Sequence, residues 1–289
     1  MIELFLDNPA IFGGFLFALG LLVGSFLNVV IHRIPKMMEQ QFRQECQLID
    51  APIDAPMPPP PRYNLVVPRS ACPSCGHAIS ALENIPVISY LILKGRCRGC
   101  KIRINPRYPL VELLCATLTA VAGLHFGVTI AAIAAILLTW FLIALVFIDA
   151  DTYLLPDSIT LPLLWLGLLF NLNNVFVPLD QAVIGAVAGY LVLWSVYWVF
   201  KLVTGKEGMG YGDFKLLAAL GAWFGWQALP SVILLSSISG AVIGIALAIL
   251  AKRGMGKPMP FGPYLGIAGW LTLIFGTTLQ QMIFNGGAI

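Results

Sequence analysis

Long stretches without a charged side chain constrain this sequence more than any other feature. A helix of roughly 17–25 apolar residues is long enough to cross a bilayer. Such stretches occupy residues 11–31 and, approximately, residues 110–128, 130–148, 158–177, 181–200, 216–229, 231–251 and 261–284. Only 11% of all residues are charged, whereas a soluble domain has about 25%. We therefore predict an all-α polytopic integral membrane protein with about eight transmembrane helices, the sixth of them short.

The distribution of positive charge predicts how these helices are oriented. No Lys or Arg precedes the first apolar stretch, so we interpret it as a permanent span and not as a secretory signal peptide, which begins with positive charge. Residues 33–107 hold eleven of the seventeen Lys and Arg residues. The other six are Lys201, Lys206, Lys215, Lys252, Arg253 and Lys257. With eight spans and an outside N-terminus, all of them fall on the cytoplasmic side, as the positive-inside rule requires.

This topology divides the chain into three predicted parts. Residues 1–33 carry the first transmembrane helix, residues 34–107 form a cytoplasmic segment, and residues 108–289 form a seven-helix membrane bundle. We expect the cytoplasmic segment to open with a proline-rich linker, APMPPPPRY at 55–63, whose composition favours an extended chain without a packed core.

Four cysteines in the cytoplasmic segment predict a metal site. They form two CxxC pairs separated by 21 residues, CPSC at 72–75 and CRGC at 97–100. Each such pair is typical of one knuckle of a tetrahedral zinc site with four cysteine ligands. The predicted insertion is therefore zinc-ribbon-like, with structural zinc bound by Cys72, Cys75, Cys97 and Cys100.

Two other interpretations of the cysteines remain open, a pair of disulfides and a dithiol redox centre. A cytoplasmic location disfavours disulfides, and the surrounding sequence does not resemble a thioredoxin. His77 follows one knuckle closely and is either a substitute ligand or an ordinary loop histidine. Cys46 and Cys115 lie outside the pattern and are expected to be ordinary thiols.

Two acidic residues stand out beside the apolar stretches. Asp149, in FIDADTYLLPD at 147–157, ends the third predicted span, and Asp213, in GMGYGDFK at 208–215, begins the sixth. Both therefore lie at the predicted cytoplasmic end of the bundle. Two carboxylates a few ångströms apart in a low dielectric share one proton. The ionised carboxyl group could then activate a water while the protonated one polarises a carbonyl, which is the mechanism of aspartic proteases.

The glycines around Asp213 fit the same hypothesis. Gly210 and Gly212 allow unusual backbone angles and the close approach of another chain, and a loop of this kind could hold an extended substrate. The alternatives are that Asp213 only caps a helix or that the pair lies on an ion path. Asp157 is interpreted as the N-cap of the fourth span, and Asp151 as a neighbour that points elsewhere or tunes the pair.

With these residues in view, the chain resembles the bacterial type IV prepilin peptidases along nearly its whole length. The resemblance rests on six stretches that occur in order: GSFLNVVIHRIP (24–35), the two CxxC pairs, NPRYPLVELL (105–114), residues 147–157, GMGYGDFK and PFGPYL (260–265). It is nearest to the bifunctional form, leader peptidase and N-methyltransferase, of Gram-negative bacteria.

The resemblance implies both an activity and a location. It implies that Asp149 and Asp213 are the catalytic aspartates of a GxGD intramembrane protease. This protease would cleave prepilins and pseudopilins after a glycine at the cytoplasmic face of the inner membrane. It also implies methylation of the new N-terminal residue, with S-adenosylmethionine as methyl donor. Nucleic acid is not an expected partner, whereas the lipid bilayer is.

The methyl-transfer site is poorly located by the sequence. No GxGxxG motif supports a Rossmann site. Glu112, an acid at the entrance of the second span, is a candidate for methyl transfer, although pairing with Arg107 would also explain it. Two other function classes also remain in view. One is a proton- or ion-coupled transporter that uses the two aspartates as relay groups, and the other is a scaffold with a zinc module.

Overall fold

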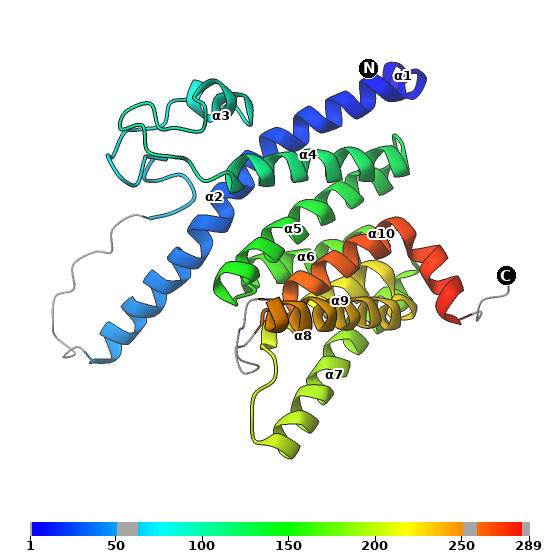
Figure 1. The fold of residues 1–289 in the computed structure, drawn as a ribbon. Coiled ribbons are helices and arrows are strands. Elements are labelled where there is room, and N and C mark those ends of the chain that lie inside the picture. The colour runs from blue at the N-terminus through cyan, green and yellow to red at the C-terminus, as the bar shows by residue number, and fades with distance from the viewer. Residues whose placement is uncertain (1, 51–62, 251–258, 285–289) are drawn as a thin grey trace. The chain divides into compact units, whose positions relative to one another are not determined.

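The computed structural model describes residues 2–50, 63–250 and 259–284, and it divides into two compact units. One unit comprises residues 10–120, and the other comprises residues 1–9 and 121–289. Regular structure in the described ranges is helical, apart from two isolated β-bridges. The prediction of an all-α membrane protein is therefore confirmed, with several apolar helices (Figure 1). Most of the proline-rich linker and the cations at 252, 253 and 257 lie outside the described residues.

The N-terminal helix extends well beyond the predicted first span. After the short α1 (Ile2–Asp7), α2 runs without interruption from Pro9 to Asp50 and includes Pro35 (Figure 1). Its second half is rich in Glu, Gln, Arg and Met, which are good helix formers. Arg43 also donates to Glu39 one turn earlier, at 2.6 Å. The segment predicted as cytoplasmic thus begins as a helix and not as a linker.

In the first unit, α2 packs closely against α4 (Arg107–Phe126). Gly20 and Gly24 form a GxxxG motif on α2. A Cβ at Gly20 would lie 2.6 Å from the Cα of Ala116, and one at Gly24 would lie 2.8 Å from the Cα of Glu112. Small residues at this spacing let two helix backbones approach within a membrane, where packing replaces the hydrophobic effect. Between α2 and α4 lie the 3-10 turn η1 (Leu82–Asn84) and the short helix α3 (Ile88–Ile92).

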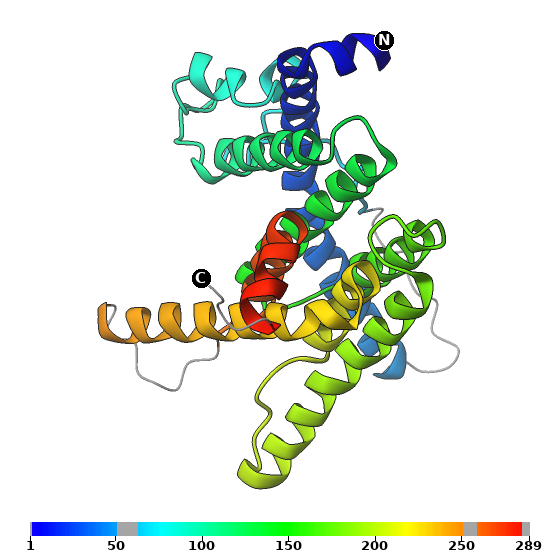
Figure 2. The same cartoon turned by 90° about the vertical axis from the view of Figure 1, so that its right-hand side faces the viewer.

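The second unit is built around a short central helix. Its elements are α5 (Ile130–Thr152), α6 (Asp157–Asn171), α7 (Leu179–Thr204), α8 (Tyr211–Phe224), η2 (Trp226–Ala228), α9 (Leu229–Leu250) and α10 (Gly262–Phe284). Nearly every residue of α8 from Asp213 onward is buried, because α6, α7 and α10 pack around it. α7 and α9 run in clearly different directions in Figure 2. A helix that is apolar on all sides belongs in the centre of a bundle.

Two contacts position α8 in the bundle. Against α7, a Cβ at Gly185 would collide with the carbonyl oxygen of Gly221, so the two backbones touch. Against α6, the indole N–H of the fully buried Trp223 donates to the carbonyl of Leu163 at 2.8 Å. The Trp223 ring also lies over Gly167, where a Cβ would meet it at 2.6 Å. These contacts leave little freedom for α8 to shift along its neighbours.

The predicted count of about eight transmembrane helices is not confirmed. Five helices in the described part of the chain are long and apolar enough to cross a membrane. α6 has 15 residues and α8 has 14, fewer than the roughly 17–25 that a span requires. The apolar stretch 216–229 continues through Gly225, where a φ of 75° ends α8. Because the turn carries no charged side chain, the search for charge-free stretches did not locate this break.

Candidate functional site

Two aspartates from separate helices are buried near each other in the second unit. Asp149 lies in the last turn of α5 and Asp213 in the first turn of α8, as the sequence predicted. Their exposed fractions are 4% and 6%. They interact electrostatically with each other, and α10 packs against both α5 and α8. The fold therefore brings together two acids that lie 64 positions apart in the sequence.

A glycine at the start of α10 holds the Asp149 carboxylate. The backbone N–H of Gly262 donates to Oδ2 of Asp149 at 2.9 Å. A Cβ at Gly262 would lie 2.6 Å from that same oxygen, so a residue with a side chain cannot occupy this position without displacing the carboxylate. Gly262 lies within PFGPYL at 260–265, to which sequence reasoning assigned no role in the site. The sequence signal that could have indicated this role is a glycine between Phe261 and Pro263, shortly after a basic segment.

Asp213 is held by the loop that precedes its own helix. The backbone N–H of Gly210 donates to Oδ2 of Asp213 at 3.2 Å, and Gly210 is the N-cap of α8. Asp213 is therefore not the N-cap of α8, as the capping alternative had it, but its third residue, whose side chain bonds back to the N-cap backbone. The other oxygen, Oδ1, is buried and has no hydrogen-bond partner among the residues described. Because such a group is costly to bury, a proton, a water or a ligand is its expected partner.

Leu155 packs between the starts of α8 and α10, against Gly212 and Gly262. A Cβ at Gly212 would lie 2.6 Å from Cβ of Leu155, and a Cβ at Gly262 would lie 3.1 Å from its Cδ1. Leu155 follows α5 after a left-handed turn at Tyr153, where φ is 58°. The same side chain thus contacts both the helix that carries Asp213 and the glycine that donates to Asp149.

Asp157 has a different role from the one expected. Pro156 occupies the N-cap of α6, and Asp157 is the first helical residue, so the N-cap prediction was wrong by one position. Both Asp157 oxygens accept from Nζ of Lys215 at 2.7 Å. This ion pair links the start of α6 to the start of α8 beside the aspartate pair. Sequence reasoning missed it because the partners lie 58 positions apart. The role of Asp151 stays a prediction.

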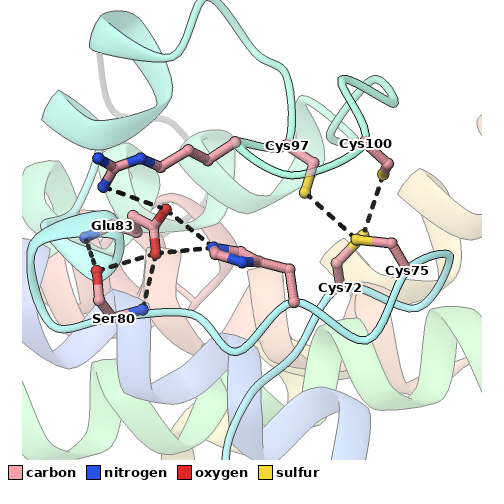
Figure 3. Close-up of polar contacts among 8 residues, drawn as sticks. Cys72, Cys75, Ser80, Glu83, Cys97 and Cys100 are labelled. Carbon is pink, nitrogen blue, oxygen red and sulfur yellow. Dashed lines mark hydrogen bonds and ion pairs between the residues drawn. The ribbon is translucent and has the colours of Figure 1, made fainter.

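The four predicted cysteine ligands converge in the first unit. Figure 3 shows Cys72, Cys75, Cys97 and Cys100 meeting from two loops, and their sulfur atoms all lie within 4.8 Å of one another. The Sγ–Sγ distance is 3.8 Å for Cys72 and Cys100 and 4.0 Å for Cys75 and Cys97. A tetrahedral ion with metal–sulfur bonds of about 2.3 Å needs sulfurs about 3.8 Å apart. The cluster therefore fits a metal ion such as zinc.

The two loops have the same backbone pattern, as expected for paired knuckles. The residue after each second cysteine, Gly76 or Lys101, has a positive φ and donates its N–H to the carbonyl of the first cysteine, at 2.9 and 3.0 Å. Each loop is closed by one isolated β-bridge. Backbone N–H groups of Ser74 and Cys75 donate to the Cys72 sulfur and lower the pKa of that thiol to about 7. A thiolate is the form that binds metal.

The nearby histidine has a carboxylate partner outside the cluster. Nε2 of His77 lies 3.2 Å from Oε1 of Glu83 (Figure 3). The backbone N–H and hydroxyl of Ser80 both donate to Glu83 at 2.9 Å, and these bonds lower the pKa of that carboxyl to about 2. His77 is thus a loop histidine beside the knuckle and is not among the four clustered ligands. Cys46 and Cys115 are likewise separate from that cluster.

Glu112 connects α4 to a strained turn just before α3. Its Oε2 accepts the backbone N–H of Val87 at 2.8 Å, and Ser25 of α2 also hydrogen-bonds to it. Val87 has φ 59° and ψ −47°, and the N–H of Ile88 donates to the carbonyl of Pro86 at 2.5 Å. This is a γ-turn of the rare, strained type. Glu112 and the aspartate pair lie in different units, and the pairing of Glu112 with Arg107 stays a prediction.

Two family descriptions match the chain over most of its length. Residues 18–126 match the bacterial peptidase A24 N-terminal domain, and residues 136–245 match the type IV leader peptidase family. The first range includes the cysteine cluster and Glu112, and the second includes Asp149 and Asp213. No solved structure matches the chain.

Several named proteins are similar to the chain from end to end. A prepilin leader peptidase/N-methyltransferase of Aeromonas salmonicida is 59% identical over 97% of both chains. Proteins of the same name from Pseudomonas aeruginosa and Dichelobacter nodosus are 58% and 54% identical. The first match covers 91% of this chain and 90% of the relative, and the second covers 91% of each.

Proposed function

The chain belongs to the type IV leader peptidase family, and on that premise we propose that Asp149 and Asp213 are the acids with which it cleaves the leader from prepilins and pseudopilins. One observation carries this assignment. Two buried aspartates on different helices interact with each other, each held through one oxygen by a glycine N–H, and Oδ1 of Asp213 has no partner within the described ranges. A pair that only supported the fold would have both carboxylates fully satisfied.

Peptide hydrolysis by this pair needs one proton shared between two carboxyl groups. The ionised group takes a proton from a water molecule as the water oxygen attacks the scissile carbonyl carbon. The protonated group gives its proton to the carbonyl oxygen, so the pair ends the step with one proton again. Collapse of the diol then returns a proton to the leaving amine. The hydrogen bonds from Gly210 and Gly262 fix both carboxylates before the substrate arrives, which lowers the cost of reaching this geometry.

The assignment is tested by conservative substitution and cleavage of a purified prepilin. Asp149→Asn and Asp213→Asn should each lower the rate roughly 10³-fold or more, the scale for losing one member of a catalytic unit. Asp180→Asn is the matched control, because Asp180 is exposed in the first turn of α7. Protein yield should be unchanged in all three variants. Normal cleavage by either single Asn variant would refute the catalytic assignment.

An ion-coupled transporter is not supported as an alternative, because the relatives are named as enzymes and the family is one of peptidases. We place the enzyme in the inner membrane, with the N-terminus outside and the aspartates at the cytoplasmic face. The positive charge on the loops after α2, α7 and α9 supports this orientation. The positive-inside rule also keeps basic prepilin leaders on the cytoplasmic side. They would therefore reach the two aspartates from the cytoplasm.

We assign zinc to the cysteine cluster as a structural ion and S-adenosylmethionine to the reaction as methyl donor. The sulfur spacing and the repeated knuckle pattern support zinc, and four thiolates leave no open coordination position. The name of the relatives supports the methylation of the new N-terminus. When bound, S-adenosylmethionine supplies the methyl group.

We propose a positioning role for Glu112 in methylation. Its carboxylate holds the γ-turn at Val87 and so fixes the cysteine segment against α4. Glu112→Ala should lower methylation while cleavage continues, and Glu112→Gln should restore methylation, because an amide oxygen can still accept the Val87 N–H. The mass of the cleaved product with and without S-adenosylmethionine measures both activities. Equal methylation by the Ala variant and the unchanged enzyme would exclude this role.

A further inference from the structure

The short helix α3 presents apolar side chains that the first unit does not cover. Ile88, Leu91 and Ile92, here called the α3 apolar surface, are all exposed, and Leu91 is 68% exposed. Their spacing of three and four residues places them on one side of the helix. Because this helix lies outside the predicted spans, three adjacent exposed aliphatic side chains need a partner.

The hydrogen bond of Glu112 shows where α3 lies along the membrane-spanning helix. Glu112 is five residues into α4, about 7 Å from its start at 1.5 Å per residue. Its carboxylate holds the N–H of Val87, the residue directly before α3. α3 therefore begins level with the second turn of a helix that is long and apolar enough to cross a membrane. Figure 1 shows the same relation, with α3 beside the start of α4.

A basic cavity lies between the end of α3 and the start of α4. It has a volume of about 680 Å³, and its lining includes Tyr90, Lys94, Arg96 and Arg103 together with residues 104–106, which lead directly into α4. The three cationic side chains are exposed. Guanidinium groups suit phosphate, and basic pockets beside transmembrane helices suit anionic lipid head groups.

We propose that α3 is an interfacial membrane anchor in the leaflet at which α4 begins. The α3 apolar surface enters the boundary between head groups and acyl chains, and the basic cavity holds the phosphodiester of an anionic phospholipid. The combination of exposed apolar side chains on α3 with cations beside the start of α4 favours a lipid leaflet over a protein partner. This inference goes beyond the proposed function and does not depend on the aspartate pair.

The test uses the full-length chain in nanodiscs that hold one copy each, made of phosphatidylcholine and phosphatidylglycerol. A fluorescent amino acid replaces Leu91, and in a matched variant it replaces Phe42, which is 66% exposed on the part of α2 beyond the predicted span. Lipids with a nitroxide high on the acyl chain should quench the probe at 91 about two-fold or more above the probe at 42, because interfacial helices bury roughly 5–10 Å into this layer.

Equal quenching at the two positions would overturn the proposal and would favour another protein, or a second copy, as the partner of this surface. If the Leu91 variant does not fold, the probe is placed at Ile88, for which the same result is expected. Neither measurement involves cleavage, so failure here leaves the assignment of Asp149 and Asp213 untouched.

A separate experiment tests the basic cavity by measuring which lipid stays bound to the purified chain. After gentle extraction, native mass spectrometry should find phosphatidylglycerol bound to the unchanged chain. Binding should be lost in the double variant Arg96→Gln/Arg103→Gln but kept in Arg43→Gln, in which an exposed arginine on α2 loses one positive charge. Added inorganic phosphate should not displace the lipid. Retention by the double variant, or displacement by phosphate alone, would contradict the lipid site.

Discussion

At the residue scale, the site requires a glycine at position 262, because a side chain there would collide with Asp149. Gly262 donates its N–H to Asp149, and the space where its Cβ would be is taken by the same carboxylate. The N–H that holds this carboxylate belongs to a helix that packs against both α5 and α8, so a shift of α10 would disturb both helices. The geometry of the pair is therefore sensitive to a single added methyl group.

Gly262→Ala should lower the cleavage rate by about 10²-fold, the scale for a misplacement of about 1 Å at a reacting group. Gly276→Ala, also in α10, is the control, because a Cβ there would meet its nearest neighbour at an ordinary 3.7 Å. Kinetics with one purified prepilin measure both variants. Comparable losses in the two variants would indicate a general effect on α10 and not on Asp149.

Asn171 is a buried polar residue whose side chain makes four hydrogen bonds to the backbone. Its amide N–H groups donate to the carbonyls of Ala222 and Trp223, at 2.9 and 3.1 Å. Its Oδ1 accepts the N–H groups of Phe176 and Val177, at 3.0 and 3.2 Å. One side chain thus joins the end of α6, the end of α8 and the loop before α7.

Asn171→Leu should destabilise the protein by roughly 2 kcal/mol or more, because several buried backbone groups would lose their partners. Asn173→Leu, at an exposed position two residues later, should have little effect. Thermal unfolding of the purified protein in detergent compares them. A melting temperature equal to that of the unchanged protein for Asn171→Leu would mean that water replaces the amide.

At the element scale, the contact between α7 and α8 determines where the first turn of α8 lies. Gly185 and Gly221 bring the backbones together at one end, and Gly189 contacts Leu217 one turn closer to Asp213. Larger residues would separate the helices and move the carboxylate with them. The packing therefore contributes to the site as well as to stability.

Gly185→Val should destabilise the bundle by about 1–3 kcal/mol, the usual cost of overpacking, and should also reduce cleavage. Val187→Leu, at an exposed position of the same helix, should do neither. The unfolding temperature and the cleavage rate are measured for both variants, Gly185→Val and Val187→Leu. Normal values of both for Gly185→Val would show that α7 and α8 can separate without consequence.

Sequence patterns predicted the elements better than their ends. The apolar stretches located α4, α5, α7 and α9 closely, and they placed Asp149 and Asp213 at the correct ends of their helices. They could not show that α8 ends at Gly225 or that α2 continues to Asp50. Hydropathy measures the environment of side chains, whereas these ends depend on backbone angles and on local hydrogen bonds.

Long-range partners were the part of the site that could not be predicted from the sequence. The cysteine spacing predicted the cluster because each knuckle is a local structure. The contacts of Asp149 with Gly262 and of Asp157 with Lys215 join residues 113 and 58 positions apart. No spacing rule covers such pairs, since they arise only when separate helices pack together.

At the scale of the whole molecule, the two units suggest two separable activities. The cysteine cluster and Glu112 lie in one unit, and both aspartates lie in the other. Cys72→Ser/Cys75→Ser should release the metal and expose the segment around the knuckles to protease. Methylation should fall when the metal is lost, while cleavage by the aspartate pair should persist.

Elemental analysis, limited proteolysis and product mass measure these three effects. Cys46→Ser is the control, because Cys46 is an exposed thiol on α2. Unchanged metal content in the double variant would contradict the metal site. Loss of both activities together would contradict the separation between units.

The shortness of α6 has a consequence for the surrounding lipid. Its 15 residues reach about 22 Å, against a hydrocarbon thickness of about 30 Å. Several of its large apolar side chains, including Trp165 and Leu169, are exposed. If α6 crosses the membrane, local thinning of the adjacent bilayer is one way to accommodate a mismatch of this size. Head groups and solvent would then lie closer to the bundle at this point, which would shorten the path of water to the proposed aspartate pair.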